Sequence, residues 1–542
     1  MKKSSPFLNI AQNKFSKPDN DGFTELWHDM AKAAETDEKD KDLSDEEIHR
    51  LVDDFIVSRD EWTRIHPYSR GALQCASDKY YAQLATSLKL SWAVMPLPDE
   101  IPDGLLHRCA MTLAAYLEDI VSGIGVWDSI RQLHRSRYGA WLPFFDCEHD
   151  EYLLDNVNIE DMKFLIWQTW CRCGLQDEMI YSPFSPAIEM MAEMVFDTLA
   201  DEFEKAPEAK RVADHVDRIF RSGDFYAVRS LAEWLVFYNP LTAAPDMVDS
   251  AVEQMHAWED DRLGISSDKA LYTVFATMAL KCHTGPEGMH ASAYLARMCA
   301  DKGFTQLAEK LESSRLVPSS AFRLTQVDRK TVTLEDASGI SYTVEKNSFG
   351  KGVDFKSSKG FVTSIVKFGD LWQQNGLAAT LTADPFEKEK RLPGFNKSPK
   401  AAELADSIAA ARRGRRVFFC KDIQQVSELL GLSYRGEKED PAEAPDNFLV
   451  LLSSTDGISL LSEYAVAIKD RTNPFYDKAQ AEYAGLKLMT SGLVPDDIAA
   501  IFQEKKMMPD VWLACSQGKR FGKRLVQDNL RYLFSFYRTE PS

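Results

Sequence analysis

The chain has 542 residues, with 83 acidic and 64 basic side chains and a formal charge of −19. Apolar residues make up 44% and aromatic residues 11%, which is too rich for a disordered protein, and the length predicts roughly two to four domains. The mean hydropathy is −0.32, and no stretch reaches roughly 18 apolar residues, which excludes a membrane-spanning helix.

Cysteine usage and the first residues of the chain predict a cytoplasmic location. The nine cysteines are odd in number and show no CxxC spacing, so we expect reduced thiols and not a disulfide framework. The first twenty residues carry lysines but no apolar segment, so no secretory signal is expected.

Charge is distributed unevenly along the chain. Residues 1–315 have a net charge of −22, whereas residues 316–542 have a net charge of +3. All ten histidines lie at or before His290. This break predicts a domain boundary at a turn near Leu316–Ser319. Any mechanism that needs a histidine must take it from the first part.

The first part is predicted to be helical. Residues 1–42 are interpreted as a flexible acidic segment, and residues 43–315 as an acidic all-α domain. Clear helix signals are the pair within 103–137 broken around Gly123–Gly125, the run 159–173 capped by Asn158, and a helix start at Ser185–Pro186. Further amphipathic runs cover 209–221, 224–237, 245–258, 267–282, 286–301 and 303–313. The short turns between them favour a helical bundle or a solenoid-like array.

From residue 319 the apolar pattern takes the period of strands. Alternation around Phe322, a turn at Asp336–Gly339 and alternation around Tyr342 predict a hairpin. Further strands are expected at Gly360–Lys367 and Leu371–Leu381, and the second of these contains Asn375-Gly376 between apolar flanks. About five short strands predict a small SH3-like or OB-like β-barrel over 318–382.

The last part mixes both kinds of element. Residues 383–402 are polar and predict a linker, and residues 403–542 predict an α/β module with C-terminal helices. Short strands are expected at 417–420 and 448–452, and helices at 401–411, 423–430, 476–489, 496–506 and 518–537. The predicted fold class is therefore multi-domain: a mainly α-helical N-terminal part, a small β-barrel in the middle, and α/β plus helices at the C-terminus.

Several segments together resemble a known family. They are YLEDIVSGIGVW (116–127), NIEDMKFLIWQ (158–168), the central hairpin, AIKDRTNPFYD (467–477), MMPDVWL (507–513) and LVQDNLRYLF (525–534). The chain resembles the uncharacterised gut-bacterial (Bacteroidetes-type) proteins of domain of unknown function 3843, over most of its length from about residue 45. The resemblance implies a bacterial cytoplasmic protein. It supplies no activity, ligand or active-site residues.

The best enzyme lead is a set of Glu-x-x-His pairs, namely Glu46–His49, Glu253–His256 and Glu287–His290. Positions i and i+3 share one face of a helix, so such a pair can hold one metal ion. Two pairs plus two single glutamates form the di-metal carboxylate site of four-helix bundles. The candidates for the singles are Glu118, Glu189 and Glu193. The competing interpretation is that such pairs arise by chance spacing. Glu287 is also expected without a metal, because the helix dipole favours acidic residues in a first turn.

A second metal lead combines Cys147, Glu148 and His149 with Cys171 and Cys173, which could close a tetrahedral zinc site. The last two lie about 200° apart around a helix axis, so we favour buried free thiols. Neither a GxSxG elbow nor a P-loop is present. No catalytic residue is assigned, and no cofactor is expected.

The second part carries a basic cluster, Arg412, Arg413, Arg415 and Arg416. Clustered arginines beside a small barrel could bind nucleic acid. The interpretation that we favour is that these side chains dock onto the acidic helical part of the same chain.

The leading hypothesis is a non-catalytic protein–protein interaction or scaffold protein with an unidentified protein partner. One alternative is a metal-dependent enzyme that uses Glu253, His256, Glu287 and His290. The other is a nucleic-acid-binding protein that uses the basic second part, which we do not favour. No membrane partner is expected.

Overall fold

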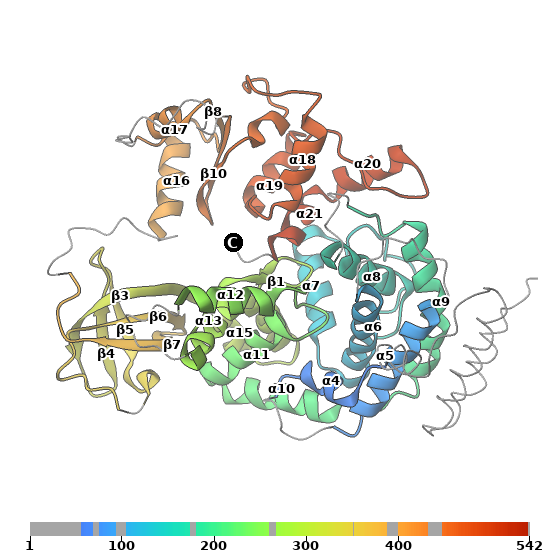
Figure 1. Cartoon of the computed structure of the whole chain (residues 1–542), viewed down its shortest axis with the longest axis horizontal. Helices are drawn as coiled ribbons and strands as arrows, with labels where there is room; N and C mark the ends of the chain where they lie inside the picture. Colours follow the sequence, from blue (N-terminus) through green and yellow to red (C-terminus); the bar gives the residue numbers. More distant parts are fainter. Residues whose placement is uncertain are drawn as a thin grey trace, which may run out of the picture. The chain divides into compact units, whose positions relative to one another are not determined.

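The computed structural model describes residues 56–68, 75–93, 104–173, 180–258, 267–350, 352–386, 399–431 and 447–539 (Figure 1). Its contacts divide the chain into two units, Met1–Ser58 and Arg59–Ser542. The helical part, the barrel and the C-terminal part all belong to the second unit. The predicted flexible segment 1–42 and the pair Glu46–His49 lie outside the described residues.

The described residues of the first part are mainly α-helical, with one short hairpin, as the apolar spacing predicts. Its helices are α4 (Arg59–Arg64), α5 (Asp78–Ala93), α6 (Leu105–Ser122), α7 (Val126–Tyr138), α8 (Ile159–Cys173), α9 (Pro186–Phe203), α10 (Lys210–Ser222), α11 (Phe225–Phe237), α12 (Met247–Trp258), α13 (Ser267–Lys281), α14 (Ala291–Asp301) and α15 (Thr305–Glu312). Helix α6 packs between α5 and α8, α11 packs on α13, and α14 packs on α7 and α15.

The predicted break between α6 and α7 is confirmed. Gly123 and Gly125 both adopt positive φ values, and the Asp119 carboxylate accepts hydrogen bonds from the amides of Val126 and Trp127 at 3.0 and 2.9 Å. This side chain therefore caps the second helix. Among the described residues, no single helix is long and apolar enough to span a membrane; α6 and α7 meet that requirement only as a pair, and they are bent by 92° to each other.

Two local predictions in the helical part are wrong. Helix α14 begins at Ala291 and not at residue 286, because residues 283–290 form a hairpin of β1 (His283–Thr284) and β2 (Met289–His290). Gly288 has φ +55°, and a Cβ atom there would lie 1.7 Å from the Ser535 carbonyl oxygen, so only glycine fits this turn.

The second correction concerns Asn158, which does precede α8 as predicted. Its carboxamide accepts from the Leu153 amide at 2.9 Å and donates to the Leu153 carbonyl at 2.8 Å. The side chain therefore holds the preceding loop and does not cap the helix.

The predicted barrel is confirmed, and its topology decides between the two barrel types. The strands are β3 (Arg315–Val327), β4 (Thr331–Glu335), β5 (Ser341–Glu345), β6 (Gly360–Phe368) and β7 (Leu371–Leu381). They close in the order β3-β4-β5-β7-β6, with β3 paired to β6 and a parallel contact between β5 and β7. An order of 1-2-3-5-4 is the Greek-key arrangement of OB folds and not the SH3 arrangement. Phe322, Phe361 and Ile365 belong to its buried core.

One predicted turn lies inside a strand. The composition break near Leu316–Ser319 falls within β3, where the register shifts between Val317 and Ser320. Asn375-Gly376 lies inside β7, beside a second register shift, and the β6–β7 turn is Gly369-Asp370. A register shift lets a strand bend around a small barrel without a turn.

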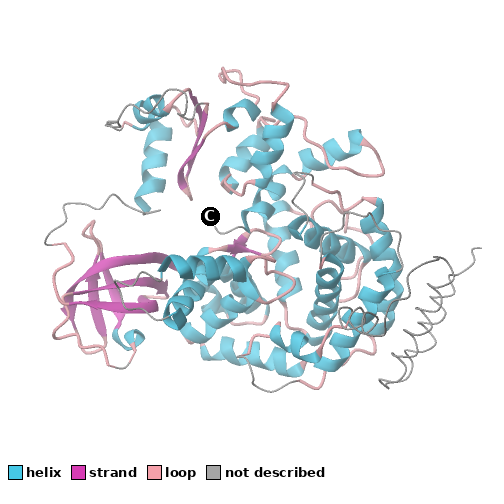
Figure 2. Ribbon diagram, in the orientation of Figure 1, coloured by secondary structure: helices cyan, strands magenta, loops and turns pink. Residues whose placement is uncertain are grey.

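The C-terminal part contains a three-stranded antiparallel sheet in the order β10-β9-β8 (Figure 2). Its strands are β8 (Val417–Cys420), β9 (Phe448–Ser453) and β10 (Gly457–Leu461), and its helices are α16 (Pro399–Ala411), α17 (Ile423–Leu430), α18 (Ala481–Thr490), α19 (Asp496–Glu504), α20 (Lys519–Asp528) and α21 (Leu530–Phe536). Helices α16 and α17 and helix α19 all contact β9, which is buried along its whole length. The helix predicted over 518–537 is divided at Asn529.

Candidate functional site

The predicted metal ligands lie in different environments. Glu253 and His256 are exposed on α12, whereas Glu287 is 0% exposed. His290 lies on β2, so the helical geometry assumed for Glu287 and His290 is wrong. Glu287 Oε1 instead lies 2.9 Å from Nδ1 of His134. Within the described part of the chain, no group of three or more His, Cys, Asp or Glu side chains could hold a metal ion.

The proposed single glutamates and zinc ligands are likewise separate. Glu118 is buried against His66, and Glu189 and Glu193 lie on α9. Cys147 and Cys171 are buried, and burial raises the pKa of both thiols to about 12. These two cysteines are therefore protonated at neutral pH and behave as small apolar side chains.

The basic cluster does not dock onto the helical part. Arg415 Nε donates to the Val417 carbonyl at 2.7 Å, and Arg416 donates to the Leu452 carbonyl at 3.0 Å and to Asp406 at 2.7 Å. Both guanidinium groups are therefore used within their own α/β module. The other two members, Arg412 and Arg413, are exposed.

An ion pair joins the helical part to the C-terminal part. Its arginine belongs to the helical part and its carboxylate to the C-terminal part, the reverse of the expected arrangement. Arg137 Nη2 lies 3.1 Å from Asp496 Oδ1, and its Nη1 donates to the Glu287 carbonyl at 2.8 Å. Asp496 also accepts from Arg531 Nε at 2.9 Å. We call His134, Arg137, Glu287, Asp496 and Arg531 the Arg137 cluster. Its groups bond to one another, so it is suited to holding the two parts together.

A second buried cluster joins α4, α5 and α6. His66 Nε2 lies 3.0 Å from Glu118 Oε2, and Trp62 Nε1 donates to Glu118 Oε1 at 3.3 Å. The Tyr68 hydroxyl lies 3.1 Å from His66 Nδ1, and Asp78 Oδ1 lies 3.8 Å from the same nitrogen. Burial lowers the pKa of His66, but Glu118 and Asp78 raise it by more, so the net shift is upward from 6.5.

An open groove lies where the barrel meets the helical part. It has a volume of about 500 Å³. Its walls come from the turn before α11, from α15, from the end of β5 with the following 3₁₀ turn (Lys346–Phe349), and from the β6–β7 hairpin. The residues that line this junction groove are Gly223, Asp224, Phe225, Tyr226, Lys310, Glu345, Asn347, Ser348, Phe368, Gly369, Asp370, Leu371 and Gln373.

Hydrogen bonds hold the floor of the junction groove in place. The Tyr226 hydroxyl lies 2.7 Å from the Ser348 carbonyl oxygen and 3.0 Å from the Gln374 carbonyl oxygen. Gln373 Nε2 donates to Glu345 Oε2 at 2.9 Å. The rings of Phe225 and Phe368 lie 5.4 Å apart. The floor is therefore formed before any ligand arrives.

The barrel wall is attached to the helical wall through β7. Asn375 is 0% exposed; its Nδ2 donates to the Ala276 carbonyl at 3.1 Å, and its Oδ1 accepts from Arg229 at 3.1 Å. The Leu377 amide donates to Thr273 Oγ1 at 3.1 Å. These bonds connect β7 to α11 and α13, so the two walls are positioned together.

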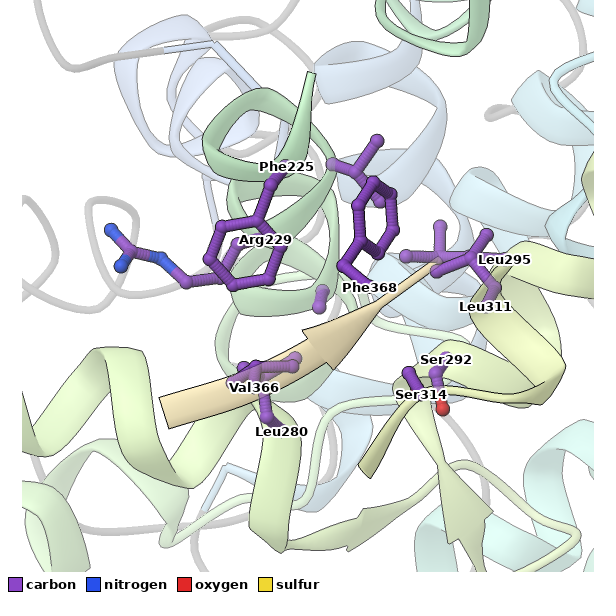
Figure 3. Close-up of a pocket in the computed structure, with 11 residues that line it drawn as sticks. Phe225, Arg229, Leu280, Ser292, Leu295, Leu311, Ser314, Val366 and Phe368 are labelled. Carbon is purple, nitrogen blue, oxygen red and sulfur yellow. The ribbon is translucent and has the colours of Figure 1, made fainter. Parts of the chain in front are cut away.

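Beneath the floor lies a small apolar cavity of about 20 Å³ (Figure 3). Phe225 and Phe368 line both spaces, and Leu280, Leu295 and Val366 belong to the cavity alone. The Arg229 guanidinium points away from it (Figure 3). The cavity has room for about one water molecule, so it is a packing space and not a ligand site.

The rim of the junction groove is acidic. Asp224 and Asp370 are exposed and Glu345 is half-buried, whereas Lys310 is the one basic residue of the lining. None of the three carboxylates forms an ion pair with any described residue. Asp224 also caps α11, because its Oδ1 accepts from the Ala227 amide at 2.9 Å. The groove therefore offers carboxylates, amides and aromatic rings to a ligand.

The helical part of the chain matches a known protein family. The family described as "Protein of unknown function (DUF3843)" matches residues 57–330, half of the chain. The chain belongs to this family. The resemblance expected from the sequence is thereby confirmed. No curated protein matches the chain, and no solved structure matches it.

In this member of the DUF3843 family, the junction groove extends past the matched region. Its helical wall, with Asp224 and Lys310, lies within residues 57–330, whereas Glu345, Asp370 and Gln373 lie beyond them. Sequence reasoning missed the groove because its walls come from four separate segments. One signal was present, since Asp224 occupies the position of a helix N-cap.

Proposed function

We propose that this member of the DUF3843 family is a non-catalytic interaction protein that holds a partner protein in the junction groove. The observation that carries the proposal is an open groove of about 500 Å³ whose two walls are fixed to each other by β7. Binding pockets commonly have volumes in this range, and a preformed wall reduces the entropy lost on binding. OB folds use the hairpin between their fourth and fifth strands to bind ligands, and here that hairpin, Gly369-Asp370, lines the groove.

The two alternatives have less support. A di-metal enzyme needs convergent pairs, but Glu253 and His256 are exposed on α12 while Glu287 is buried against His134. Nucleic acid binding needs cations facing the phosphates, but the acidic rim would repel them. Many OB folds bind nucleic acid on the face of their second and third strands, which are β4 and β5 here. The outward residues of this face include no lysine or arginine; they are Thr331, Thr333, Glu335, Ser341 and Thr343.

We place this function in the bacterial cytoplasm. The family resemblance implies that setting. All nine cysteines are unpaired, which suits a reducing compartment.

Site-specific photocrosslinking tests the proposal. A photoreactive residue is introduced at Asn347, which is exposed in the groove, and as a control at Ala337, which lies at the other end of β5. In a native lysate we expect a discrete protein adduct from position 347 and none from position 337. The adduct is then purified and its binding measured with Asn347→Trp and Ala337→Trp. We expect at least tenfold weaker binding for the first and no change for the second. The same adducts from both positions, or none from position 347, would contradict the proposal.

A further inference from the structure

The charge balance of the junction groove points to the kind of segment that it accepts. Three carboxylates, of Asp224, Glu345 and Asp370, face one ammonium group, that of Lys310. The neighbouring Lys346 does not line the groove; its Nζ lies 3.3 Å from the Asp328 carbonyl oxygen and 5.2 Å from the centre of the Phe355 ring. The lining therefore has a net charge of −2.

An independent observation shows that cations suit the aromatic floor. Lys310 Nζ lies 5.7 Å from the centre of the Phe368 ring. A cation over the face of an aromatic ring is attracted by the ring quadrupole. Phe225 lies beside Phe368, with the ring centres 5.4 Å apart, so both aromatic side chains contribute to the floor.

We propose that the junction groove binds an arginine-rich segment of a protein partner; this inference rests on the proposed function. A guanidinium group can lie flat on the aromatic floor while its N–H groups donate to the carboxylates of the rim. A lysine can make the charge contact but not the planar, two-point one, so arginine is preferred. The net charge of −22 on residues 1–315 attracts such a segment over a longer range.

The opposite ligand chemistries fit less well. Phosphate and carboxylate groups would meet the unpaired carboxylates of Asp224 and Asp370. A fully apolar segment would cover the polar side chains of Asn347, Glu345 and Gln373 without giving them new hydrogen bonds, which costs free energy. An arginine-rich segment brings positive charge to the carboxylates of the rim and N–H donors to the polar side chains of the lining.

Fluorescence anisotropy with labelled peptides tests the inference on the full-length protein. The probes are Gly-Ser peptides of equal length that carry three arginines, three lysines, three glutamates or no charge. We expect binding in the order arginine, lysine, uncharged, with none for glutamate, and weaker binding at higher salt.

Two groove variants are compared with a control that has the same change in charge. Asp224→Asn/Asp370→Asn removes two rim charges and leaves a residue that still caps α11. Asp150→Asn/Asp214→Asn removes two exposed charges that do not line the groove. We expect about 3- to 10-fold weaker arginine-peptide binding for the first double variant and less than about 1.5-fold for the second. Lys310→Gln should strengthen binding by about 2-fold, because it removes the competing cation.

Equal losses in the two double variants would overturn the inference, since they would reflect net charge alone. Weaker binding by Lys310→Gln, or binding of the glutamate peptide, would also overturn it. A crosslinked partner whose adduct maps to a neutral or acidic segment would remove this inference and leave the proposed function intact. Arginine peptides that bind with no protein adduct at position 347 would support the chemistry of the groove and contradict the proposed function.

Discussion

The Arg137 cluster and the junction groove use similar side chains in opposite ways. In the Arg137 cluster, Glu287 is 0% exposed and bonded to His134, and Asp496 is shared between two arginines. In the groove, Asp224 and Asp370 are exposed and form no ion pair with a described residue. A buried charge destabilises the fold unless it is paired, whereas an exposed charge is solvated by water and remains accessible to a partner. The difference separates groups that hold the fold together from groups that are available for binding.

The largest expected effect is on the Arg137 cluster. Glu287→Ala leaves the buried His134 without its carboxylate partner and removes the carboxylate oxygen that lies 3.8 Å from Arg137 Nη1, so the free energy of unfolding should fall by about 3–5 kcal/mol. The control is Glu253→Ala on α12, an exposed glutamate for which we expect a change within about 0.5 kcal/mol. Urea denaturation measures both. Similar losses of unfolding free energy in the two variants would contradict the distinction between acidic residues that are paired within the fold and acidic residues that are exposed.

A second pair of variants compares the support of the groove with its lining. Asn375→Ala removes the bonds to Ala276 and Arg229 and should cost about 1–3 kcal/mol of stability. Asn347→Ala removes an exposed amide and should change stability by less than about 0.5 kcal/mol. Thermal unfolding and partner binding are measured together. We expect Asn375→Ala to lose both and Asn347→Ala to lose binding only; loss of stability in the second variant would show that the lining is structural.

The basic cluster allows the same comparison on a smaller scale. Arg415→Met removes bonds to the Val417 carbonyl and to Thr472, so stability should fall by about 1 kcal/mol. Arg412→Met changes an exposed side chain and should be neutral within about 0.5 kcal/mol. Chemical denaturation separates these outcomes. If Arg412→Met is the more destabilising variant, our account of which arginines are structural is wrong.

The most gradual effect concerns pH and the buried His66. Its pKa is raised from 6.5 in the folded protein, so the protonated form favours folding. This stabilisation is fully present below pH 6.5, the unfolded value, and is lost as the pH rises through the folded pKa. Unfolding is measured between about pH 5.5 and 8.5 for the wild type, for His66→Gln and for the exposed control His256→Gln. We expect the decline to be shallower only in His66→Gln; an unchanged slope in that variant would exclude His66 as its source.

Much of the fold could be predicted from the sequence because its signals are local. The break at Gly123–Gly125, the helix start at Ser185–Pro186 and the strands of the barrel depend on residues that are neighbours in the chain. The helical period and the strand period are properties of such neighbours. The order all-α, barrel and α/β with helices is therefore confirmed.

Other features were decided only by contacts between distant residues. At Gly288 the Ser535 carbonyl oxygen lies where a side chain would have to stand, and residues 283–290 form a hairpin instead of the helix expected for Glu287 and His290. His134 and Glu287 pair across 153 positions of the chain. The OB order required the pairing of β3 with β6, which no strand signal contains.

The candidate site shows the same division. The acidic charge of the chain, most of its helices and the strands of its barrel follow from local sequence. Only the tertiary structure placed Asp224, Lys310 and Asp370 around one groove. The physical reason is that periodicity records how a segment buries one face, whereas a binding site depends on which segments bury those faces against each other.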